Sequence, residues 1–113
     1  MKAVCKFYWE FRRSGNSVEG LFIADSDDVK WVLDNKVEVD LGEAAGKHSE
    51  VFGPLEGEEI TIVSTDVEVV EIIEKHAQSG YNPFDYPCLG SEVLGIENLD
   101  DETVQQYVDR NKK

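Results

Sequence analysis

The chain has 113 residues, of which 24 are Asp or Glu and 11 are Lys or Arg, giving a formal net charge of −13. This length suits one domain with one core, and the charge disfavours direct binding to a nucleic-acid backbone, which requires basic side chains. No stretch approaches the ~18 consecutive apolar residues of a membrane span, and Lys6 interrupts the apolar start where a secretory signal would continue. We therefore expect a cytoplasmic protein that does not contact membranes.

Residues 3–24 predict a β-hairpin. Apolar side chains alternate with others along its first half: Cys5, Phe7, Trp9 and Phe11. Such alternation is typical of a half-buried strand. Gly15 and Asn16 can supply the positive-φ positions of the turn, and residues 18–24 return as the partner strand.

A short helix is predicted next, capped by Asp25 or Ser26. Its apolar residues share one helical face: Val29, Val32 and Leu33. Residues 36–41 then resume strand alternation, with one apolar side: Val37, Val39 and Leu41. Residues 50–57 and 58–64 predict two more strands, and Pro54 places the first of them at a sheet edge or bulge.

The clearest helical pattern runs from Asp66 to Ala77, where residues 65–68 have the spacing of a capping box. Its apolar stripe recurs at i, i+3, i+4 and i+7: Val69, Ile72, Ile73 and His76. We expect this stripe to face the core, with His76 at the core margin. Gly80 is expected to form a left-handed cap just past the helix.

Residues 81–90 predict an ordered aromatic loop, because Pro83 and Pro87 cannot continue a helix. Asn82 sets a turn, and three rings anchor the loop to the domain: Tyr81, Phe84 and Tyr86. Residues 97–113 predict a last helix that starts near Asn98 or Asp100. Its apolar stripe is narrow, so this helix either docks loosely or buries that stripe against a partner.

Together these elements predict an α+β domain with a mostly antiparallel sheet of about five strands and two or three helices packed on one face. Residues 1–90 are expected to form the domain, and residues 91–113 an acidic C-terminal helical extension.

The stretch LGEAAGKHSEVFG, residues 41–53, concentrates reactive side chains but does not fit a phosphate-binding P-loop. Gly42 and Gly46 enclose three residues instead of four, and His48 stands where a hydroxyl is needed. A looser anion site at Lys47 stays open, although neighbouring carboxylates oppose it.

His48 is also a candidate general base or metal ligand beside Glu50 or Glu43. A zinc site needs three or four converging ligands, and adjacent residues such as His48 and Ser49 point to opposite faces of a strand. Cys5 and Cys88 form no Cys-x-x-Cys pair and are expected to be buried, reduced thiols. We predict no catalytic residue, no metal and no cofactor.

Three blocks, FYWEFRRSGNSVEGLFIAD, GKHSEVFGPLE and SGYNPFDY, carry a resemblance to a known family. The chain resembles a small family of uncharacterised proteins from bacteriophages and bacterial genomes over residues 6–86. The resemblance implies a phage-like origin and, for a phage-encoded protein, the cytoplasm of a bacterial host. It implies no assigned activity.

Charge carries the first functional hypothesis. Between Val37 and Glu74 the chain has 11 acidic residues and one basic residue, Lys47. The residues expected to form an acidic surface are Glu56, Glu58, Glu59, Glu68 and Glu71. This surface predicts a non-enzymatic accessory protein that binds a basic protein partner, including the possibility of a nucleic-acid mimic; the alternative is that the acidity only maintains solubility.

A second hypothesis is a small-molecule or nucleotide site between two segments. The residues expected to line it are Lys47, His48, Ser49, Glu50, Tyr81, Asn82, Phe84 and Tyr86. A third, enzymatic hypothesis centres on His48 with Glu50 or Glu43. The sequence contains no signal for the oligomeric state.

Overall fold

The computed structural model describes residues 1–10, 17–42, 52–57, 59–91, 96–97 and 102–112. Its elements in chain order are β1 (Lys2–Glu10), β2 (Ser17–Asp25), α1 (Ser26–Asp34), β3 (Glu38–Asp40), β4 (Phe52–Pro54), β5 (Ile60–Ser64), α2 (Val67–His76), β6 (Ser79–Gly80), the 3-10 helix η1 (Pro83–Asp85), β7 (Cys88–Ser91), β8 (Ile96–Glu97) and α3 (Val104–Asn111). No helix within these ranges is long and apolar enough to cross a membrane.

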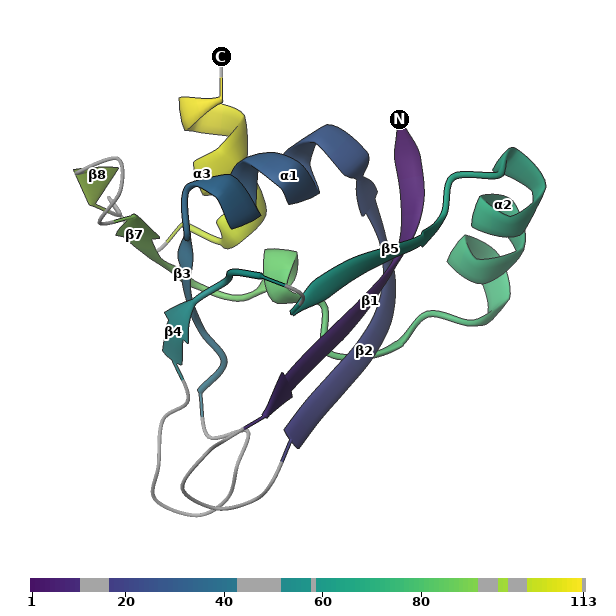
Figure 1. The fold of residues 1–113 in the computed structure, drawn as a ribbon, viewed down its shortest axis with the longest axis horizontal. Helices are drawn as coiled ribbons and strands as arrows, with labels where there is room; N and C mark the ends of the chain where they lie inside the picture. The colour runs from purple at the N-terminus through teal and green to yellow at the C-terminus, as the bar shows by residue number, and fades with distance from the viewer. Residues whose placement is uncertain (11–16, 43–51, 58, 92–95, 98–101, 113) are drawn as a thin grey trace.

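The strands form two antiparallel sheets of four strands each, in the orders β5-β1-β2-β6 and β4-β3-β7-β8 (Figure 1). The predicted α+β class with mostly antiparallel pairing is confirmed. The single sheet of about five strands is wrong, because β6 and β8 have only two residues each and β7 falls in the stretch predicted to be a loop. β4 ends the second sheet, as Pro54 predicts.

The β1–β2 hairpin is confirmed. The two strands pair from Lys2 opposite Asp25 to Glu10 opposite Ser17. Alternation along β1 turns one set of side chains into the core: Ala3, Cys5 and Phe7. The predicted turn with Gly15 and Asn16 lies outside the described residues.

One cluster of buried apolar side chains joins the hairpin to α1, β3, β7 and α3. The Asp25 side chain caps α1 by accepting hydrogen bonds from the amides of Asp27 and Asp28, and the helix buries Val29 and Val32. The predicted cap is confirmed, as are Val29 and Val32 on the core face, whereas the predicted third member, Leu33, is only partly buried.

α3 buries its apolar stripe in the same core: Val104, Tyr107 and Val108. Its first turn is closed by a capping box between Thr103 and Gln106, so the helix begins later than predicted from Asn98 or Asp100. Lys112 binds Asp28 of α1 at 2.7 Å. The last helix therefore docks on its own domain and shares a core with the residues before 91.

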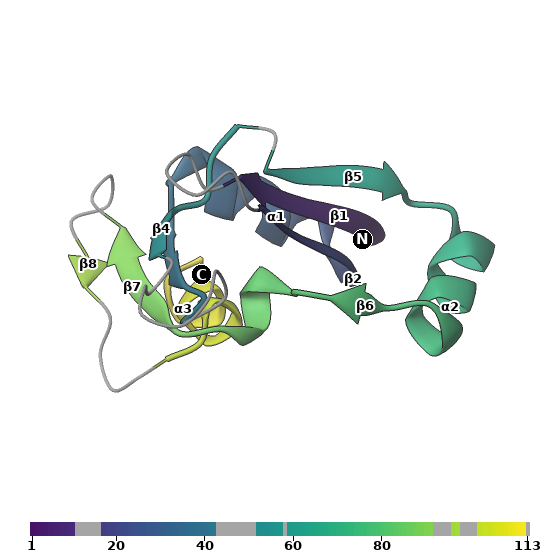
Figure 2. The same ribbon diagram turned by 90° about the horizontal axis from the view of Figure 1, so that it is seen from below.

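α2 lies at one end of the first sheet, away from α1 and α3 (Figures 1 and 2). Lys2 and Val4 alternate with Ala3 along β1, so their side chains lie on the opposite face of the sheet. On this face Lys2 binds Glu74 of α2 at 3.1 Å, and Val4 is buried. α2 itself buries only Val70 among its ten residues. This arrangement differs from the predicted packing of all helices on one face.

The chain returns from α2 along β6, where Gly80 lies opposite Gly20 of β2. Gly80 has a φ of 70°, which is left-handed as predicted, but it lies in the β2–β6 pairing. The C-cap of α2 is Ala77, so the prediction that Gly80 caps this helix is wrong. Asn82 then accepts a hydrogen bond from the Phe84 amide at 3.0 Å, and Phe84 is buried against Phe22. The predicted anchored loop is thus the turn η1.

Candidate functional site

β5 is an edge strand of the first sheet, and of the described strands only β1 pairs with it. Residue pairs in an antiparallel ladder alternate between hydrogen-bonded and non-hydrogen-bonded. The Tyr8 amide donates to the Glu59 carbonyl at 2.9 Å, and the register continues with Ile60 opposite Phe7 and Ile62 opposite Cys5. Ile60 and Ile62 therefore direct their backbone N–H and C=O groups away from β1.

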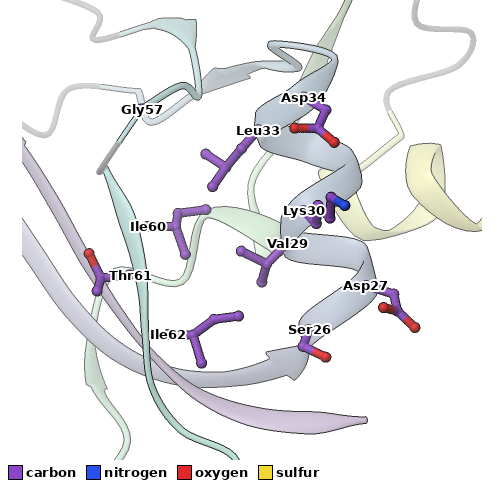
Figure 3. Close-up of a pocket in the computed structure, with 10 residues that line it drawn as sticks. All are labelled: Ser26, Asp27, Val29, Lys30, Leu33, Asp34, Gly57, Ile60, Thr61 and Ile62. Carbon is purple, nitrogen blue, oxygen red and sulfur yellow. The ribbon is translucent and has the colours of Figure 1, made fainter.

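A groove of about 730 Å³ runs between β5 and α1 (Figure 3). Four apolar side chains point into it from the two walls: Val29, Leu33, Ile60 and Ile62. This volume lies within the range of sites that bind ligands, about 300–1,000 Å³. Because β1 occupies the other side of β5, the groove opens beside the outward-facing edge of the strand.

The rim of this groove is acidic. Asp27 and Asp34 line it from the exposed side of α1, with Lys30 between them along the helix. Within the described ranges no cation forms an ion pair with either aspartate, whereas neighbouring Asp25 binds the N-terminal amine at 2.8 Å and Asp28 binds Lys112. The bond from that amine lowers the pKa of the Asp25 carboxyl. The rim therefore carries two carboxylates against one lysine, and the N-terminal amine and Lys112 also lie near Asp27.

The described residues contain little that resembles a reactive centre. No group of three or more His, Cys, Asp or Glu side chains among them comes together to hold a metal ion. Cys5 and Cys88 are free, fully buried thiols, and burial raises the pKa of each to about 11. A thiol with such a pKa is a poor nucleophile near neutral pH.

Of the two segments predicted to line a small-molecule site, the structure describes only the one that contains Tyr81 and Tyr86. Lys47, His48, Ser49 and Glu50 lie outside the described residues. On the other side, the Tyr81 and Tyr86 rings contact each other with centroids 5.8 Å apart and planes tilted by 40°, and the buried Phe84 belongs to the core. Phe84 therefore anchors the loop and does not present its ring to a ligand.

The predicted acidic surface is divided by β5. Glu56 and Glu59 precede this strand, and Glu56 also forms an ion pair with Lys36 at 3.5 Å. Glu68 and Glu71 lie on α2, beyond the other end of the strand. Glu58 lies outside the described residues. The described members are thus not brought together into one surface.

Sequence reasoning missed the α1–β5 groove, since it assigned Leu33 to the core and left Ile62 within an unremarkable strand. One signal was present. The strand ITIVS contains no charged residue or proline of the kind that usually protects an edge.

Comparisons with protein-family models, with curated proteins and with solved structures find no match for this chain.

Proposed function

We propose that this protein is a non-catalytic binding module that takes an extended, basic segment of a partner protein into the groove between α1 and β5. The observation that carries the proposal is the outward-facing backbone of Ile62, which is 42% exposed, beside an apolar groove. An extended peptide can add to such an edge as a further strand, with main-chain hydrogen bonds supplying affinity.

Side chains of the bound segment supply selectivity. Alternate residues of an added strand point to the same face, so every second residue of the peptide would enter the groove and meet Leu33 and Ile62. Residues near the rim would meet Asp27 and Asp34. Apolar residues alternating with Lys or Arg therefore fit the groove, and the formal net charge of −13 favours encounters with basic partners.

We place this encounter in the cytoplasm, where the two buried thiols would stay reduced. The phage-like origin implied by the resemblance is compatible with an accessory protein that binds a host protein. An extended segment is favoured over a broad basic surface because Glu56 and Glu59 are separated from Glu68 and Glu71 by β5.

The proposal is tested with three capped octapeptides and fluorescence anisotropy. The first alternates Val and Lys, the second alternates Val and Glu, and the third is the Val-Lys peptide N-methylated at alternate residues. We expect the first to bind, with weaker affinity as salt rises from about 50 to about 500 mM, and the second not to bind. N-methylation removes main-chain donors worth about 1 kcal/mol each, so the third should bind about tenfold more weakly or worse.

Matched variants locate the site. Ile62→Lys should abolish binding by placing a charge in the groove, whereas Val63→Lys should not, because Val63 is the neighbouring exposed residue and does not line the groove. The double variant Asp27→Asn, Asp34→Asn should keep the fold and weaken binding of the Val-Lys peptide. Equal affinity for the methylated peptide, or equal loss in both lysine variants, would contradict the proposal.

A further inference from the structure

The apolar stripe of α2 faces solvent. Ile72 is 59% exposed and Val69 is 40% exposed, while Ile73 is half-buried. Together with His76, which is also exposed, these residues form what we call the α2 stripe. The helix lies at one end of the molecule, clear of α1 and α3 (Figures 1 and 2).

Contacts on the other side of the helix hold the α2 stripe outward. Val70 is buried on the sheet side, and Glu74 binds Lys2 at 3.1 Å. Just beyond the helix, the Gln78 side chain accepts a hydrogen bond from the Ile23 amide of β2 at 3.3 Å. Turning the stripe inward would break these contacts, so we expect it to be covered by another molecule.

The charges beside the α2 stripe are self-complementary. Glu68 and Lys75 are seven residues apart, which is close to two helical turns, so they lie along the same flank of the stripe at opposite ends of α2. Neither side chain forms an ion pair with another residue in the described part of the chain. When two such helices pack antiparallel about a two-fold axis, the same flank of each copy meets, and Glu68 of each faces Lys75 of the other.

We propose that the α2 stripe is the contact between two copies of this chain, packed α2 against α2 in antiparallel orientation. The Glu68 and Lys75 pairs put the two-fold axis midway between Glu71 and Ile72. The Ile72 side chains of both copies then meet near the axis, and Val69 lies between Ile73 and His76 of the second copy. A partner with any other charge arrangement would leave Glu68 or Lys75 unmatched.

This contact is independent of the α1–β5 groove, and it responds to salt in the opposite direction. Two copies that each carry a net charge of −13 repel one another. Salt screens this repulsion and also the two exposed Glu68–Lys75 pairs, but each pair contributes at most about 1 kcal/mol, so we expect the relief of net repulsion to dominate and the contact to strengthen. One helical face buries less than the roughly 800 Å² per partner of a standard interface. The association is therefore weak and appears at high protein concentration.

Sedimentation velocity tests the contact from about 10 µM to about 1 mM protein, which covers the dissociation constants of associations worth about 4 to 7 kcal/mol. We expect the wild type to shift toward a dimer, and the shift to grow between about 50 and about 300 mM salt. Ile72→Glu should remain monomeric throughout. Val67→Glu is the matched control, because Val67 is 70% exposed on the opposite side of α2, and it should still dimerise.

Charge reversal provides a test that does not depend on apolar packing. Glu68→Lys alone and Lys75→Glu alone should each weaken the dimer severalfold, since each places like charges opposite one another twice. The double variant reverses both partners and should restore dimerisation; circular dichroism confirms that each variant is folded. A monomeric wild type at the highest concentration, or a double variant weaker than either single variant, would overturn the proposal. Peptide binding in Ile72→Glu reports separately on the groove.

Discussion

Glu59 shows how burial acts on a single residue next to the edge strand. Its side chain accepts a hydrogen bond from the Glu56 amide at 2.9 Å. Burial still raises the pKa of the Glu59 carboxyl, and the nearby Glu56 charge adds to the increase. The folded protein therefore holds the proton of Glu59 more tightly than the unfolded chain does.

Because of this raised pKa, removing the Glu59 charge should increase the stability of the folded protein by an amount that depends on pH. As pH rises through the unfolded pKa of 4.5, the unfolded chain ionises first, so the wild type loses stability until the pH passes the folded pKa. Glu59→Gln cannot ionise and still offers an oxygen to the Glu56 amide. Thermal melts should show equal Tm values for variant and wild type near about pH 4 and a higher Tm for the variant at neutral pH.

The exposed residue Glu19 supplies a control for the overall charge, because Glu19→Gln removes the same charge from the surface of β2. Its melting curves should differ little from the wild type at any pH. A Tm gap between Glu59→Gln and the wild type that stays constant with pH would show that Glu59 titrates normally in the folded state.

At the scale of elements, the junction between β2 and β6 depends on two glycines that face each other. A Cβ atom on Gly20 would overlap the carbonyl oxygen of Tyr81, and one on Gly80 would overlap that of Glu19. The backbones approach this closely because neither residue has a side chain. This junction also returns the chain from α2 to the core, so it helps to set the position of that helix.

Gly20→Ala should therefore destabilise the protein by about 3 kcal/mol through a backbone clash, measured by chemical denaturation. Gly57→Ala is the comparison, since Gly57 has a φ of 62° and open space around it, so only about 1 kcal/mol of backbone strain is expected there. Equal losses in the two variants would show that β2 and β6 do not approach as described.

In α2, the periodicity of the sequence predicts the helix and its apolar face, but not how that face is oriented in the fold. The spacing of Val69, Ile72 and Ile73 correctly places them on one face, whereas the capping box predicted over residues 65–68 is wrong, because the N-cap is Asp66. Periodicity does not state which face meets the sheet. That choice depends on contacts far apart in sequence, such as Lys2 with Glu74, so the prediction that this stripe and His76 pack toward the core is wrong.

At the scale of the whole molecule, sequence predicts the parts that have long regular patterns. The nine-residue strands of the hairpin alternate clearly, and α1 has both a capping aspartate and an apolar face. Two strands of the second sheet, β3 and β4, lie within predicted strands, but their separation into a second sheet was not predicted, because its strands have two to four residues and come from four separate segments. The α1–β5 groove is a product of this tertiary arrangement, since α1 and β5 are separated by more than twenty residues.

Folding also separates acidic residues that are close together in the sequence. The acidic run between Val37 and Glu74 is continuous in sequence, but β5 carries its later residues to α2 at the far end of the molecule (Figure 1). We therefore propose partner recognition at the groove beside β5, where backbone, apolar and acidic groups occur together, and self-association through α2.

Amide hydrogen exchange, followed residue by residue with and without the Val-Lys octapeptide, tests the central claim most directly. An added strand would bond to the outward-facing amide of Ile62, which is exposed, so exchange should slow there while Thr61, which faces β1, changes little. Slowing that is absent from β5 and appears instead on α2 or near Tyr81 and Tyr86 would contradict binding at the edge of β5.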